Sequence, residues 1–122
     1  MINIAGLNDA SIQRTADIIS TGRLAAFPTE TVYGLGADAT NDGAVAAIFA
    51  LKNRPDFNPL IVHVPDIDSA SEHVHFTPIA HTLATAFWPG PMSLVLERKD
   101  QSTVSLLAVA GLDTMAVRIP SH

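Results

Sequence analysis

Polar side chains that could bind a small anionic ligand gather in one segment, residues 27–64. Lys52 and Arg54 form a Lys-x-Arg pair near its middle. Pro55 disfavours helical geometry at Arg54, so both cations lie where a predicted helix gives way to extended chain and could reach one anion. Basic residues in a last helical turn also simply complement the helix dipole. The spacing alone does not decide between the two interpretations.

Hydroxyl groups and glycines precede this basic pair. Thr29, Thr31 and Tyr33 would present their hydroxyls on one side of the chain if the loop is extended. Gly34 and Gly36 can adopt positive φ and would let a ligand approach the backbone closely. An ordinary surface turn with solvated hydroxyls explains the same residues equally well.

The segment GLGADA, residues 34–39, also satisfies the glycine pattern of a dinucleotide-binding fingerprint. That fingerprint needs its glycines directly after a strand and at the mouth of a helix. Here PTETVY intervenes, and the next helix is expected only at its N-cap, Asn41. We therefore disfavour a Rossmann site.

Apolar periodicity predicts the elements that must position these residues. The first helix, capped by Asn8 or Asp9, should bury Ile12, Ala16 and Ile19 and stop at Gly22. Further helices are expected at residues 41–52, 68–74 and 77–88, and strands at residues 24–27, 60–64, 92–97 and 114–119.

His63 is the one polar residue in LIVHV, residues 60–64, a run typical of a strand buried on both faces. An isolated His in such a strand is more often a hydrogen-bonded core residue than a catalytic one. Its position at the end of the strand favours a cleft, where perturbed histidines gather.

Thr114 and Arg118 share one face of the last predicted strand, and Met115, Val117 and Ile119 share the other. About 13 Å of strand separates the two polar residues, so together they could serve both ends of a nucleotide plus an amino acid. The polar solvent face of an edge strand would show the same pattern.

Composition excludes several function classes. The 122 residues are 48% hydrophobic and suit one domain with a real core. Twelve acidic and seven basic residues give a net charge of −5. This sign disfavours binding to the negatively charged backbone of a long nucleic acid, so a single nucleotide is the better-supported partner. Without Cys, a secretory leader or a membrane span, we expect a soluble cytoplasmic protein that binds no membrane.

His73, His75 and His81 lack metal-ligand spacing, so we expect solvated histidines and no metal.

The motifs PTETVYGLGADA, KNRP and NPLIVHV, followed by WPGP and VRIP, resemble the N-terminal half of the YrdC-type threonylcarbamoyl-AMP synthases. The resemblance covers nearly the whole chain. It implies a single YrdC-like domain over residues 1–122, with an α/β (α+β) fold of an open twisted mixed sheet flanked by helices. The chain stops at RIPSH, where family members continue into a Ser-x-Asn segment and a later Ser-Thr segment. We therefore expect a C-terminally truncated domain whose uncovered edge or apolar face favours self-association.

Carried over by position, the resemblance implies that Thr31, His63 and Arg118 contact L-threonine. Arg118 is the natural partner for its carboxylate. Ser93 stands where the family usually has Thr, a change that keeps the hydroxyl.

The resemblance likewise implies that Arg54, Asn58 and Thr114 contact ATP. Lys52 and Arg54 match the first half of the family's paired Lys-x-Arg and Ser-x-Asn signature. As the catalytic pair, they would meet phosphate or carbamate charge.

The implied reaction joins L-threonine, bicarbonate or CO₂, and ATP. A carbamate oxygen attacks the α-phosphate and expels pyrophosphate, which gives threonylcarbamoyl-AMP for proteins that modify tRNA. Mg²⁺ is expected on the phosphates, and positioning with charge neutralisation suffices for the protein's part. Two alternatives remain: a module that binds double-stranded RNA or tRNA and is inactive as a fragment, which the acidic balance disfavours, and a carbamoyl-transfer domain of a larger enzyme.

Overall fold

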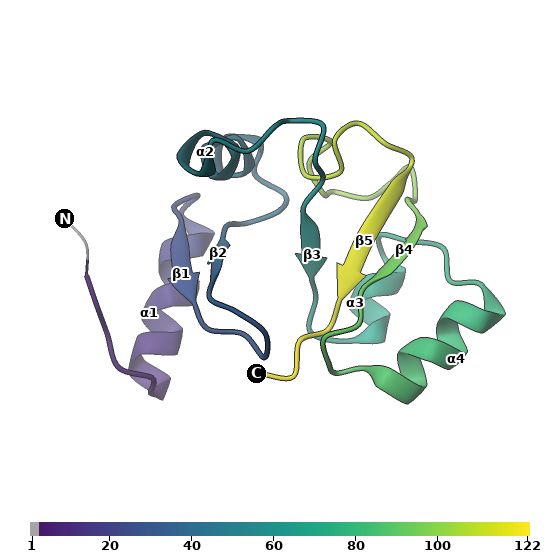
Figure 1. The fold of residues 1–122 in the computed structure, drawn as a ribbon, viewed down its shortest axis with the longest axis horizontal. Coiled ribbons are helices and arrows are strands. Elements are labelled where there is room, and N and C mark those ends of the chain that lie inside the picture. Colours follow the sequence, from purple (N-terminus) through teal and green to yellow (C-terminus); the bar gives the residue numbers. More distant parts are fainter. Residues whose placement is uncertain (1–2) are drawn as a thin grey trace.

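The computed structural model describes residues 3–122 as helices packed around two small sheets (Figure 1). Within these residues, no helix is long and apolar enough to cross a membrane. The predicted mixed α/β architecture is confirmed, and the strands divide between a two-stranded and a three-stranded sheet. In chain order the elements are α1 (Asp9–Ser20), β1 (Ala25–Phe27), β2 (Gly34–Gly36), α2 (Asp42–Lys52), β3 (Ile61–His63), α3 (Ile67–Ser71), α4 (Pro78–Phe87), β4 (Leu94–Glu97) and β5 (Thr114–Arg118).

The long helices begin where their capping residues predict. The side chains of Asn8, Asn41 and Thr77 each accept a hydrogen bond from a backbone N–H in the first turn of α1, α2 and α4. Each cap satisfies a donor that has no partner within the helix. α3 starts at Ile67 because the Asp66 carboxylate caps it, so the predicted range of residues 68–74 was displaced.

The apolar face predicted for α1 is only partly covered. Ile12 is 55% exposed, Ala16 is exposed and Ile19 is half-buried, and no residue of α1 is fully buried. α1 lies beside β1 at one end of the molecule, away from the three-stranded sheet (Figure 1). The expectation of a buried first helix was therefore wrong for the described residues.

β1 and β2 form an antiparallel hairpin in which Phe27 pairs with Gly34. Strand β1 falls within the strand predicted at residues 24–27, and its residues are only partly buried. Gly34 and Gly36 lie within β2 and neither has positive φ, so the loop with positive φ expected at these glycines was wrong. A Cβ at Gly36 would overlap the Phe27 ring. Gly36 is therefore needed to make room for this ring.

The three-stranded sheet has the order β3-β5-β4. β3 runs parallel to β5, with His63 opposite Arg118, and β4 runs antiparallel to β5, with Leu94 opposite Val117. β5 is thus the central strand, and the edge-strand interpretation of its Thr114 and Arg118 face was wrong.

One face of this sheet carries the core. Val62 of β3 and Val64, the residue directly after β3, pack with Met115 and Val117 of β5. α3 and α4 lie over this face (Figure 1), and they add Ala70, Ala84 and the residue after α4, Trp88. The helices cover one face only, so Ile61 and His63 on the opposite face remain exposed. The prediction that residues 60–64 are buried on both faces was therefore wrong.

Gly90 sits in the tight turn between α4 and β4, where its N–H donates to the Ile119 carbonyl over 2.8 Å. A Cβ there would lie 2.7 Å from the backbone oxygen of Phe87. We expect Gly90→Ala to lower the free energy of unfolding by about 1–3 kcal/mol, because backbone must shift. Urea denaturation measures the change. Gly6→Ala is the control, since a Cβ at Gly6 meets nothing within 4 Å, and equal stability of both variants would contradict the prediction.

Candidate functional site

The residues predicted for the site lie on the open face of the three-stranded sheet and at its two ends. His63 and Arg118 are register partners on adjacent parallel strands, so their side chains project from the same face. Thr114 shares this face at the start of β5. The loop between β1 and β2 runs toward the carboxyl ends of β3 and β5 (Figure 1). Carboxyl ends of parallel strands are where open α/β sheets bind ligands.

Arg118 is held in place by a neighbouring strand. Its Nε donates to Ser93 Oγ over 3.0 Å, just before β4 begins. The guanidinium is half-buried, and a ligand carboxylate would be bound by its terminal nitrogens. The sequence showed only that a hydroxyl is kept at Ser93, and nothing in it indicated that this hydroxyl orients Arg118.

His63 has a lowered pKa. The first cause is its partial burial, the second is the Arg118 guanidinium, and the Glu30 carboxylate acts in the opposite direction. The imidazole is therefore neutral at pH 7.

We expect NMR titration to give His63 a pKa below 6.5, and Arg118→Gln to raise it because a cation is removed. The folded state binds this proton less well than the unfolded state does. The contribution of His63 to stability is thus fully present above pH 6.5 and is lost as the pH falls through the folded pKa. An unchanged His63 pKa in Arg118→Gln would contradict the assignment.

The hydroxyl-bearing loop is bent, so the extended interpretation was wrong. Thr29 Oγ1 donates to the Val32 carbonyl over 2.6 Å and accepts from the N–H of Thr31. The two threonine hydroxyl oxygens lie 3.1 Å apart. Tyr33 is 80% exposed. Thr31 is therefore positioned by Thr29, and its exposed side chain is free to meet a ligand.

The residues predicted to contact ATP lie at the other end of the three-stranded sheet, where the chain leaves α2 and enters β3 (Figure 1). Arg54 donates from Nε to the Asn58 carbonyl over 2.9 Å and from a terminal nitrogen to the Pro59 carbonyl over 2.7 Å. Lys52 is the last residue of α2 and is exposed. Asn53 ends the helix in the left-handed conformation, with φ of 48°. Arg54 thus shapes the loop over residues 54–59 and still presents its charge there.

The structure therefore divides the predicted site into two groups. One group lies at the carboxyl end of β5 and consists of His63 and Arg118, and the loop that carries Thr31 runs toward it (Figure 1). The other lies toward its amino end and consists of Lys52, Arg54, Asn58 and Thr114. Four residues along β5 correspond to about 13 Å, a span suited to a ligand that reaches from one group to the other.

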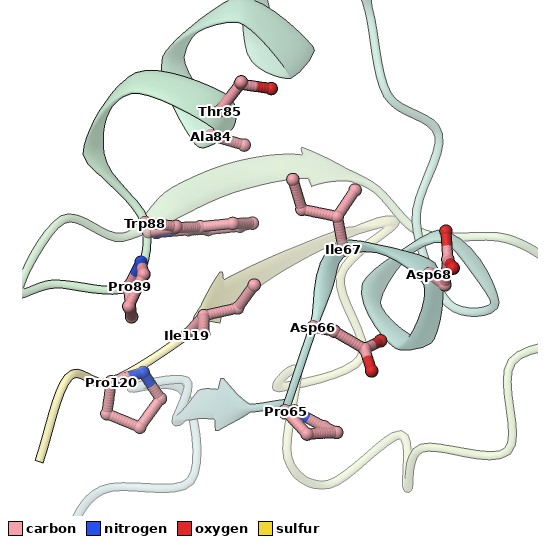
Figure 2. Close-up of a pocket in the computed structure, with 10 residues that line it drawn as sticks. All are labelled: Pro65, Asp66, Ile67, Asp68, Ala84, Thr85, Trp88, Pro89, Ile119 and Pro120. Atoms are coloured by element: carbon pink, nitrogen blue, oxygen red, sulfur yellow. The ribbon is translucent and has the colours of Figure 1, made fainter.

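Two cavities in the described part of the chain lie elsewhere. A cavity of about 600 Å³ opens on the helical side, where Figure 2 shows Trp88, Ile119 and Ile67 around it. A second, of about 350 Å³, is lined by Phe57, Leu106 and neighbouring residues. Neither is lined by any residue predicted for the site. The candidate site therefore coincides with neither of these cavities.

The histidines outside the site form no metal centre in the part of the chain that the structure describes, since no group of three His, Cys, Asp or Glu residues there could hold an ion. His73 Nδ1 lies 2.9 Å from Ser102 Oγ, so the expectation of a solvated side chain was wrong for this residue. His75 and His81 are exposed.

A protein-family model matches most of the chain. The model of the Sua5/YciO/YrdC family, described as "Telomere recombination", matches residues 17–122. The chain belongs to the Sua5/YciO/YrdC family. This membership confirms the resemblance drawn from the PTETVYGLGADA, KNRP and NPLIVHV motifs.

Individual members of the Sua5/YciO/YrdC family are substantially similar in sequence. The chain is 44% identical over 117 residues to a threonylcarbamoyl-AMP synthase of Pyrococcus abyssi, covering 95% of this chain and 34% of the relative. It is 45% identical over 116 residues to that of Bacillus subtilis, covering 94% and 33%. The chain thus spans about a third of the length of these relatives.

Solved structures of family members superpose closely on this chain. Pyrococcus abyssi Sua5 in complex with L-threonine superposes with a TM-score of 0.89 at 44% identity, over 97% of this chain and 34% of that one. Escherichia coli YciO has a TM-score of 0.81 at 20% identity, over 95% and 56%. The second likeness supports the fold alone.

Glu30 is a candidate site residue that the sequence pattern did not reveal. Both carboxylate oxygens are buried, and neither has a hydrogen-bond partner within residues 3–122. Glu30 also acts on the pKa of His63, which places it near the His63 and Arg118 end of the candidate site. Its position between two threonines in PTETVY drew attention to the hydroxyls, and nothing in the pattern marked a buried carboxylate.

Proposed function

We propose that the complete gene product is a threonylcarbamoyl-AMP synthase acting on L-threonine, bicarbonate or CO₂, and ATP. The observation that carries the proposal is the 44–45% identity of 94–95% of the chain to relatives of that name. The superposition on a relative bound to L-threonine supports the same substrate. We further propose that residues 1–122 belong to one YrdC-like domain.

At the carboxyl end of the sheet, the terminal nitrogens of Arg118 would bind the threonine carboxylate while Ser93 holds Nε. Thr31 and His63 would contact the rest of the amino acid. A neutral His63 at pH 7 can both donate and accept a hydrogen bond, which suits a hydroxyl ligand.

At the other end, Arg54, Asn58 and Thr114 would contact ATP. Lys52 and Arg54 would neutralise the charge that builds up as the carbamate oxygen attacks the α-phosphate and pyrophosphate leaves. Positioning and charge neutralisation are the main demands of such a step. The amino acid and the nucleotide would then lie along β5.

Mg²⁺ would come with the ATP. It commonly keeps several waters and binds through substrate phosphates with one or two carboxylates. The chain's own contribution is the cation pair beside those phosphates.

The product, threonylcarbamoyl-AMP, would serve tRNA modification by proteins acting downstream, and we place this activity in the cytoplasm. Direct binding of tRNA or double-stranded RNA stays a prediction that a filter-binding titration at several salt concentrations tests, since phosphate contacts require a steep salt dependence. Self-association also stays a prediction, and sedimentation as a monomer at all concentrations would contradict it.

The test of the main proposal is pyrophosphate release by the complete gene product. We expect release only when ATP, L-threonine and bicarbonate are all present. Omitting L-threonine is the matched control. Absence of release with all three substrates would contradict the proposed activity.

A further inference from the structure

The Glu30 carboxylate is buried without a partner. Neither oxygen has a hydrogen-bond partner in the described part of the chain, and each is almost completely shielded from solvent. An ionised carboxylate removed from water is unfavourable unless a positive charge or hydrogen-bond donor meets it. Such a group in a folded protein therefore calls for a functional explanation.

The position of Glu30 indicates what it meets. It lies in the bent loop between β1 and β2, directly before Thr31, and this loop runs toward the carboxyl ends of β3 and β5 (Figure 1). Glu30 and Arg118 both act on His63, with opposite effects on its pKa. His63 thus lies within the field of one negative and one positive side chain.

This arrangement of charge is complementary to a free α-amino acid. At neutral pH such a molecule carries a carboxylate and an ammonium group on the same carbon. Arg118 suits the carboxylate, and its Nε is already held by Ser93. The remaining charge of the ligand is an ammonium, and the remaining charge of the site is the unpartnered Glu30 carboxylate.

We propose that Glu30 binds the α-ammonium group of the amino-acid substrate and, with Arg118, selects a zwitterionic α-amino acid. This assignment rests on the proposed function. A purely structural role would require Glu30 to hold the loop through a hydrogen bond, and its oxygens make none within residues 3–122. The loop is instead closed by Thr29 and Val32.

The test compares two ligands of the complete gene product by isothermal titration calorimetry. L-Threonine carries the ammonium, and β-hydroxybutyrate is the same molecule without its amino group. We expect Glu30→Gln to weaken L-threonine binding by about 30-fold or more, the scale for losing one partner of a buried charge pair. Binding of β-hydroxybutyrate should stay within about threefold of the wild type, since that ligand has no charge to place at Glu30. Glu72→Gln, at an exposed position after α3, is the matched control and should leave both affinities unchanged.

Two results would overturn the assignment: retained L-threonine binding in Glu30→Gln, or an equal loss of both ligands. The role of Glu30 and the proposed enzymatic activity are contradicted by different results. If the wild type binds L-threonine but releases no pyrophosphate, the activity is wrong, and selective loss of L-threonine in Glu30→Gln still supports the role of Glu30. If the wild type releases pyrophosphate and Glu30→Gln discriminates between the two ligands as the wild type does, only the role of Glu30 is wrong.

Discussion

Arg118→Ala is expected to lower kcat/KM of the complete gene product for L-threonine by about 100-fold or more, measured as pyrophosphate release at saturating ATP. The variant loses the cation that would pair with the substrate carboxylate. It also frees Ser93 Oγ, whose single hydrogen bond to Nε contributes only about 1 kcal/mol to stability. The fold should therefore survive while binding is lost.

Two further variants sharpen this prediction. Arg118→Lys keeps the charge but loses the planar pair of donors, so we expect an intermediate kcat/KM. Arg14→Ala removes an exposed charge on α1, far from the three-stranded sheet, and should leave kcat/KM unchanged. Activity of Arg118→Ala equal to that of Arg14→Ala would refute a role for Arg118 in binding.

Arg54→Ala should lower the rate of pyrophosphate release by about two orders of magnitude or more, with a raised KM for ATP. The Arg54 side chain has two functions in the structure. It donates to the carbonyls of Asn58 and Pro59, and it places a positive charge beside the loop expected to meet ATP. Its removal would leave two carbonyls without their donor and the phosphates without a cation.

Lys52→Ala separates these two contributions. Lys52 is exposed, so its replacement should leave thermal stability unchanged. Because its charge is expected to meet the phosphates, the same replacement should lower the rate of pyrophosphate release by orders of magnitude. Arg54→Ala should lower both, and Arg54→Lys should restore charge without restoring both hydrogen bonds. Thermal denaturation beside the pyrophosphate assay distinguishes the variants. A Lys52→Ala enzyme with full activity would show that the basic pair only complements the end of α2.

Local features of the structure were predictable because they depend on neighbours in sequence. Asn8, Asn41 and Thr77 start their helices as expected, since a capping side chain bonds to an N–H three residues away. The alternation at residues 114–119 likewise separated buried Met115 and Val117 from the polar face. Both signals act within a few residues, and tertiary context did not override them.

Burial was predicted less well because it depends on which elements cover a segment. LIVHV reads as a strand covered on both faces, yet α3 and α4 cover one, so His63 belongs to an open face. Gly36 reads as a ligand-binding loop residue, yet it faces the Phe27 ring across a hairpin. In each case the deciding neighbour is remote or paired in a way that periodicity does not reveal.

By itself the sequence determined the family and the residue types at the candidate site, because motifs such as PTETVYGLGADA and KNRP are contiguous. Only the tertiary structure decided that β5 is central and that His63 and Arg118 are register partners. It also placed the residues predicted to contact ATP at the opposite end of the sheet. It also revealed the buried carboxylate of Glu30. Solvation and charge pairing arise from segments brought together by folding, and a linear pattern of residues does not contain them.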